Sequence, residues 1–174
     1  NVSVGEQVTL TYKILTQLPI TQVELKEIPA LNGFWVEEIP TSKNPEAQNR
    51  VVNGKQFAEY IVKKQALFPT GAGTQQIPSS TFGLVVRTGT GGLFSLGSQE
   101  AVLRKTDPIA IKVAAIPEKG RPPNFVGAVG NFKLESSVDK SSAETGEAVN
   151  LKVTLTGIGN LKTITDFPLP SLPG

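Results

Sequence analysis

Apolar and polar side chains alternate along residues 8–14. One set is large and mostly apolar and the other is polar: Val8, Leu10, Tyr12 and Ile14 against Thr9, Thr11 and Lys13. A period of two places the sets on opposite faces of a β-strand, one buried and one facing water. The same alternation recurs at Val149, Leu151, Val153 and Leu155. Each stretch therefore predicts one strand of a sandwich.

Turn residues divide the rest of the first 116 residues into short segments. Asn53-Gly54 predicts a two-residue hairpin turn, because both of its central residues need positive φ. Residues 57–68 are ambiguous, since their apolar spacing fits a helix whereas the preceding turn favours a strand. Further strands are expected on both sides of a corner within 67–78, in a hairpin of 82–88 with 99–105, and at Ile109, Ile111 and Val113. About seven or eight such strands are enough for a sandwich.

A long internal repeat gives the domain plan. Residues 5–15 (GEQVTLTYKIL) match residues 146–156 (GEAVNLKVTLT), and the same offset relates residues 29–33 to residues 170–174. The identical pairs are Gly5 and Gly146, Glu6 and Glu147, Val8 and Val149, Leu10 and Leu151, Pro29 and Pro170, Leu31 and Leu172, and Gly33 and Gly174. A repeat of this length is a whole domain.

The repeat predicts tandem immunoglobulin-like β-sandwich domains, the second one incomplete. Residues 1–116 form the first domain, residues 117–124 (PEKGRPPN) a stiff Pro-rich linker, and residues 125–174 the first strands of the second. Residues 131–139 are expected to open the second domain. Their counterpart in the first domain falls before Asn1, so we expect that domain to lack its opening strand.

Composition removes several classes of function. The net charge is only +2, from 17 basic and 15 acidic residues, which does not favour binding to nucleic acid. Histidine and cysteine are absent, which removes the commonest zinc ligands and the histidine of hydrolase triads. We therefore expect a protein that is not an enzyme, with no cofactor, no metal and no small-molecule substrate.

Four segments carry a resemblance to a known family. They are GEQVTLTYKI from residue 5, LNGFWVEEIP at 31–40, ALFPTGAGTQQIP at 66–78 and NFVGAVGNFKLE at 124–135. Together they resemble the BatD-type aerotolerance (oxygen tolerance) proteins of bacteria. The resemblance implies tandem periplasmic β-sandwich domains and, in the full-length protein, a membrane anchor that is not among residues 1–174. It also implies protein partners, such as the von Willebrand A domain membrane proteins of the same system.

Two aromatic residues form the candidate interaction surface. Phe34 and Trp35 are adjacent on an expected strand, so one should be buried and the other should face outward, where a large aromatic side chain could anchor a partner. Glu37 and Glu38 should likewise face opposite ways and cannot serve as paired catalytic carboxylates. Gly89–Gly92 lacks the Lys-Ser/Thr ending of a phosphate loop. The glycines of residues 127–130 are expected to permit close packing at the interdomain joint.

Two functions follow as expectations. The first is a non-catalytic binding or scaffold module of the cell envelope, and the alternative is a carbohydrate-binding or adhesive immunoglobulin-like module. We also expect the 1–174 chain to associate with other copies or to exchange strands with them. Residues 125–174 expose an apolar face, and residues 131–139 are the expected donor strand.

Overall fold

The computed structural model describes residues 2–89, 98–123, 125–161 and 164, and within them the chain is built from β-strands without an α-helix. This confirms the predicted all-β fold. The strands are β1 (Val2–Ser3), β2 (Val8–Thr16), β3 (Ile20–Glu27), β4 (Phe34–Ile39), β5 (Gln48–Val52), β6 (Lys55–Pro69), β7 (Gly73–Ile77), β8 (Thr81–Thr88), β9 (Ser98–Lys105), β10 (Ile109–Ala114), β11 (Gly130–Val138) and β12 (Leu151–Gly159).

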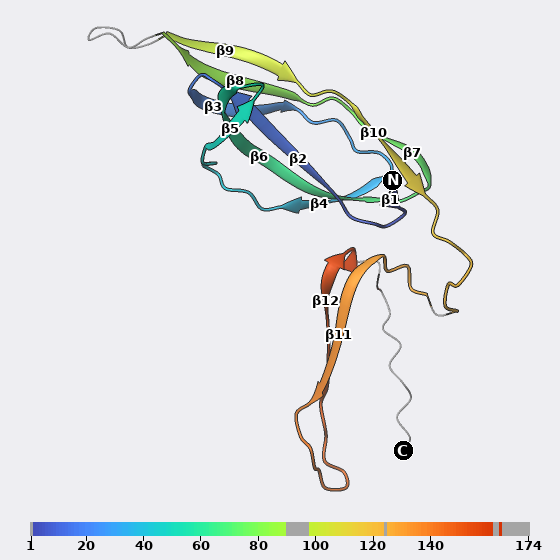
Figure 1. Ribbon diagram of the computed structural model, residues 1–174. Helices are drawn as coiled ribbons and strands as arrows, with labels where there is room; N and C mark the ends of the chain where they lie inside the picture. Colours follow the sequence, from blue (N-terminus) through green and yellow to red (C-terminus); the bar gives the residue numbers. More distant parts are fainter. Residues whose placement is uncertain (1, 90–97, 124, 162–163, 165–174) are drawn as a thin grey trace.

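The first ten strands form two facing layers (Figure 1). One layer has the order β2–β6–β4, and β5 pairs with the part of β6 that β4 leaves uncovered. The other layer contains the sheet β3–β8–β9 and the smaller sheet β1–β10–β7, in which β1 and β10 are parallel. All other pairs in these sheets are antiparallel. The arrangement is a sandwich-type fold.

The ambiguous segment 57–68 lies entirely in β6, so the strand interpretation is the right one. Its register against β2 shifts between Tyr12, opposite Lys63, and Lys13, opposite Ile61. Val62 is thereby left over as the extra residue of a β-bulge. A bulge interrupts the alternation of inward and outward side chains, which is why the apolar spacing of this strand resembles that of a helix.

The core lies between the two layers. It contains Leu10, Tyr12 and Leu67 from one layer and Ile77, Phe82, Leu84 and Val86 from the other. Val8 and Ile14 pack against this cluster, Thr9 and Lys13 are exposed, and Thr11 is partly buried. The predicted apolar face of residues 8–14 is therefore confirmed, and the predicted exposure holds for Thr9 and Lys13 but not fully for Thr11.

A buried hydroxyl pair ties the layers together. The hydroxyl groups of Tyr12 and Ser80 are 3.2 Å apart, and the Tyr12 ring packs at a tilt on Phe82 with 5.4 Å between ring centroids. Ser80 is fully buried, and its backbone N–H donates to the Thr106 hydroxyl at 3.0 Å. Both hydroxyls thus have partners, as buried polar groups require.

The predicted hairpins are present. Asn53 and Gly54 have φ values of 51° and 75° and join β5 to β6, as the Asn-Gly turn requires. β8 pairs with β9 over its whole length, and β10 carries the predicted last strand of this part of the chain. Of the glycine segment 89–92, only Gly89 lies among the described residues.

Strands β1 and β3 were not predicted from the pattern. β1 has two residues, too few to show a period. β3 pairs with β8 through two register shifts, which break its alternation. Both strands therefore form through their neighbours rather than through a local signal.

The internal sequence repeat is also seen in the structure, because residues 3–6 and 144–147 form turns with the same hydrogen bonds. The Glu6 N–H donates to the Ser3 carbonyl at 3.1 Å, and the Ser3 N–H donates to Oε2 of Glu6 at 2.8 Å. Glu147 and Glu144 make the same two bonds at 2.9 and 3.2 Å. Each turn needs a glycine with positive φ at its third position, Gly5 at 77° and Gly146 at 90°. This shared geometry supports the duplication.

After β10, the next strand among the described residues is β11, and the intervening segment contains turns. The Arg121 N–H donates to the Glu118 carbonyl at 3.2 Å, and the Phe125 N–H donates to the Pro122 carbonyl at 3.1 Å. β11 and β12 then form an antiparallel pair that extends away from the sandwich (Figure 1). Of the apolar side chains expected to be exposed here, Leu134, Val149 and Leu151 are exposed, whereas Val153, Leu155 and Ile164 are partly buried.

An ion-pair cluster lies on the outer face of β6. Glu59 is buried, and its carboxylate accepts a hydrogen bond from Lys13 Nζ at 2.9 Å and lies 3.3 Å from Nη1 of Arg50. The hydrogen bond from Lys13, which outweighs the opposing effect of burial, lowers the pKa of Glu59 below its ordinary value; the charges of Lys13 and Arg50 add to this. The ionised form therefore stabilises the fold, as charge-assisted hydrogen bonds do.

Core and surface positions of β2 should respond differently to truncation. Leu10→Ala should lower the free energy of unfolding by about 2–5 kcal/mol, because it removes core contacts. Thr9→Ala, the exposed neighbour on the same strand, should cost less than about 1 kcal/mol. Urea unfolding followed by circular dichroism measures both. Equal losses would contradict the register of β2.

The Glu59 cluster predicts a pH-dependent difference in stability. A carboxylate with a lowered folded-state pKa stabilises the fold above the unfolded-state pKa, and this contribution disappears as the pH falls through the folded-state value. Glu59→Gln should therefore be less stable than wild type at pH 7, and the difference should shrink toward pH 3. The exposed Glu118→Gln controls for the lost charge. A Glu59→Gln difference that is constant with pH would contradict the ion-pair assignment.

Candidate functional site

The two candidate residues lie at the start of β4 and face opposite ways. Phe34 packs against the core, whereas Trp35 points outward and is 49% exposed. This confirms the predicted facing. The Trp35 indole N–H donates to Oε1 of Glu37 at 2.7 Å. Glu37 lies two residues along on the same face of β4, and this hydrogen bond holds the orientation of the ring.

Trp35 borders an apolar groove whose floor is formed by the end of β6. In the β4–β6 register Trp35 lies opposite Phe68, and Phe34 lies opposite Pro69. Phe68 is 5% exposed although it faces outward with Trp35, so neighbouring groups cover it. The groove has a volume of about 460 Å³ and is lined by Val4, Gly5, Trp35, Phe68, Pro69, Thr70, Ile116, Gly127 and Asn160.

Besides β4 and the end of β6, three other parts of the chain line the groove. Gly5 belongs to the repeated turn and is held by a hydrogen bond from its N–H to the Pro69 carbonyl at 2.8 Å. Ile116 and Gly127 flank the Pro-rich linker, and Asn160, which is buried, directly follows β12. The groove therefore lies at the joint between the sandwich and the β11–β12 pair.

The glycines expected at this joint behave differently from one another. A Cβ on Gly127 would meet nothing within 4 Å, so close packing is the wrong reason for this glycine; its φ is 81°. A Cβ on Gly130 would lie 2.3 Å from the Ile158 carbonyl oxygen. Close approach is therefore needed at Gly130, but between β11 and β12 rather than between domains. Gly5 makes the contact across the joint, since its Cβ would lie 3.5 Å from Val129 Cγ2.

Glu37 and Glu38 point to opposite faces, as predicted, and have different partners. Glu38 accepts hydrogen bonds from Lys63 Nζ at 2.7 Å and from Gln65 Nε2 at 2.8 Å. Burial opposes ionisation of Glu38, but these hydrogen bonds outweigh it and lower its pKa. Glu37 instead accepts from Trp35. The two carboxylates do not converge on one site.

The described part of the chain contains no group of three or more histidine, cysteine, aspartate or glutamate side chains that could hold a metal ion. Within the same residues no helix is long and apolar enough to span a membrane. Comparison of the chain with protein-family models, with curated proteins and with solved structures finds no match.

The joint should depend on the conformation of Gly5. Gly5→Ala should lower the free energy of unfolding by about 1–2 kcal/mol, because it places an alanine at positive φ. Gly71→Ala is the control, since its Cβ would lie 4.0 Å from Gln75 Nε2, its nearest neighbour, and its φ lies outside the left-handed region. Thermal unfolding followed by the fluorescence of Trp35, the single tryptophan, measures both. Equal effects would show that the turn tolerates a side chain.

Proposed function

We propose that this chain is a non-catalytic protein-binding or scaffold module of the bacterial cell envelope, similar to the periplasmic region of BatD-type aerotolerance proteins. The observation that carries the proposal is the half-exposed Trp35 beside an apolar groove. Tryptophan is enriched among the residues that dominate binding energy, because its side chain combines a large rigid apolar surface with an indole N–H that can donate a hydrogen bond. In Trp35 this N–H already donates to Glu37, so the ring is held in place before a partner binds.

The chemistry of the groove favours an apolar anchor from a protein partner. Its described lining residues include no carboxylate, lysine or arginine. Binding would therefore come from apolar contact, with Thr70 and Asn160 as the polar groups beside it. A partner side chain such as leucine or phenylalanine would fill this space and cover the exposed part of Trp35. No catalytic residue or cofactor enters the proposal.

The proposed partner is a von Willebrand A domain membrane protein of the same system. The sequence resemblance supports this choice and also supports a periplasmic location, with a membrane anchor in the full-length protein. The proposed immunoglobulin-like topology is a common scaffold for such contacts, because two-layer sandwiches present rigid faces and edges.

A carbohydrate-binding or adhesive module is less favoured. Sugar platforms usually present several coplanar aromatic rings, whereas Trp35 is the one aromatic residue among the exposed large hydrophobic side chains of the described chain. A glycan that perturbs Trp35 emission at micromolar concentration would favour this alternative instead.

The test is titration of the purified von Willebrand A domain against wild type and two variants. Trp35→Ala should weaken binding at least about tenfold, the effect of losing a hot-spot residue. Leu103→Ala removes another exposed apolar side chain, 63% exposed on β9, and should leave the affinity unchanged. Absence of binding by the wild type, or equal affinities for all three proteins, would contradict the proposal.

A further inference from the structure

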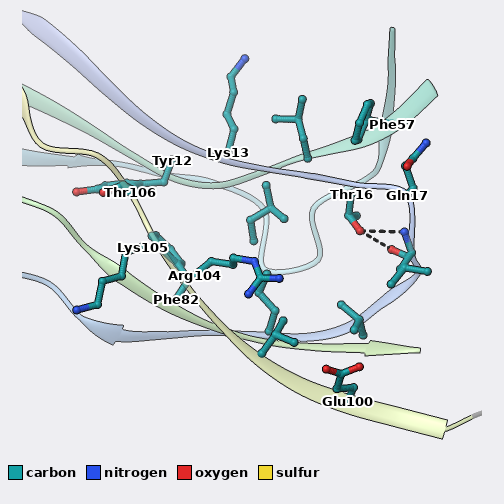
Figure 2. A pocket seen from close by; sticks show the side chains of 16 residues that line it. Tyr12, Lys13, Thr16, Gln17, Phe57, Phe82, Glu100, Arg104, Lys105 and Thr106 are labelled. Carbon is teal, nitrogen blue, oxygen red and sulfur yellow. Dashed lines mark hydrogen bonds between the residues drawn. The ribbon is translucent and has the colours of Figure 1, made fainter. Parts of the chain in front are cut away.

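The Trp35 groove is built differently from the groove along β2. The groove along β2 has a volume of about 550 Å³, and all the residues that line it lie between Tyr12 and Thr106 (Figure 2). Its walls therefore belong to the sandwich alone. The Trp35 groove is lined in addition by Gly127 and Asn160, which lie beyond the Pro-rich linker. Its shape therefore depends on how the sandwich and the β11–β12 pair are placed relative to each other.

The two parts of the chain make few contacts with each other. Within the described residues, the strands of the sandwich pack extensively only on one another, and β11 and β12 only on each other. The turn at Gly5 contributes a contact across the joint, since a Cβ there would lie 3.5 Å from Val129 Cγ2. Two parts of a chain move relative to each other unless a large apolar interface holds them together. We therefore expect their placement to change in solution.

The connection between β10 and β11 contains two residues in a backbone conformation that glycine adopts readily and other residues do not. Gly120 and Gly127 have φ values of 84° and 81°, and a Cβ on either would meet nothing within 4 Å. Packing therefore does not require these glycines, whereas the backbone conformation does. Interdomain hinges are short connecting segments, often with small residues, that absorb changes of φ and ψ. The two glycines suit this role.

We propose that the joint regulates the Trp35 groove: the groove forms in one placement of the β11–β12 pair and opens in others, so a bound partner fixes the joint. An apolar side chain in the groove contacts Trp35 and Phe68 on the sandwich and Gly127 on the other side, so it binds this placement more tightly than others. The coupling is reciprocal, because fixing the joint in this placement raises the affinity for the partner by the same factor. This inference rests on the proposed function for the identity of the partner.

A disulfide across the joint provides the test, because the chain contains no cysteine of its own. A Cβ on Gly5 would lie 3.7 Å from Val129 Cβ, a separation that suits a disulfide. The Gly5→Cys/Val129→Cys double variant is compared with itself in the oxidised and the reduced form, so the strain of a side chain at Gly5 is common to both. The monomeric Gly5→Cys single variant, treated in the same way, is the control. Failure of the disulfide to form under mild oxidation would overturn the proposal.

The first measurement needs no partner. Trp35 is the single tryptophan, so quenching of its fluorescence by acrylamide reports how open the groove is. The bimolecular quenching constant should be at least about 1.5-fold lower in the oxidised double variant than in the reduced one, because the disulfide removes the placements in which the groove is open. Oxidation should leave the constant of the single variant unchanged. Equal constants for the two forms of the double variant would overturn the proposal.

The second measurement is titration with the purified von Willebrand A domain. The oxidised double variant should bind it at least about threefold more tightly than the reduced one, because the apparent affinity falls with the fraction of chains in the competent placement. Equal affinities of the two forms would contradict the coupling. If the wild type does not bind this domain at all, the proposed function fails, and the quenching measurement still decides whether the joint controls the groove.

Discussion

The pairing of β6 with three other strands is the interaction on which the rest of the structure depends. β2 lies along one edge of β6, while β4 and β5 share the other. The alternation of β6 sends Leu67, which is fully buried, into the core and Phe68 to the opposite face. Through the same register β4 turns Phe34 inward and Trp35 outward. The core and the proposed binding groove thus lie on opposite faces of one sheet.

The parts of the fold that follow from local pattern could be predicted from sequence. Residues 8–14 show an undisturbed period of two, and Asn53-Gly54 has the φ values that its turn demands. Tertiary pairing breaks the period in two strands: the bulge left the type of the β6 segment ambiguous, and the two register shifts of β3 left that strand unpredicted. A bulge is set by the partner strand as much as by the bulged one, so a single strand's sequence does not disclose it.

The candidate site was predictable in part for the same reason. The opposite facing of Phe34 and Trp35 follows from the geometry of any strand. The groove beside Trp35 does not, because Gly5, Ile116 and Asn160 are brought to it by three separate parts of the chain. The sequence repeat did indicate one part of this site, the turn that contains Gly5, because Gly5 and its counterpart Gly146 form turns of the same geometry.

The central claim is that one sheet, with β6 at its middle, carries the core on one face and the Trp35 groove on the other. Residue-resolved amide hydrogen exchange tests this directly. Amides of β6, which has partners along both edges, and those of β2 that point toward β6 should exchange most slowly, because they open only when the sheet unfolds. Rapid exchange throughout β6, with slow exchange confined to β8 and β9, would contradict the account.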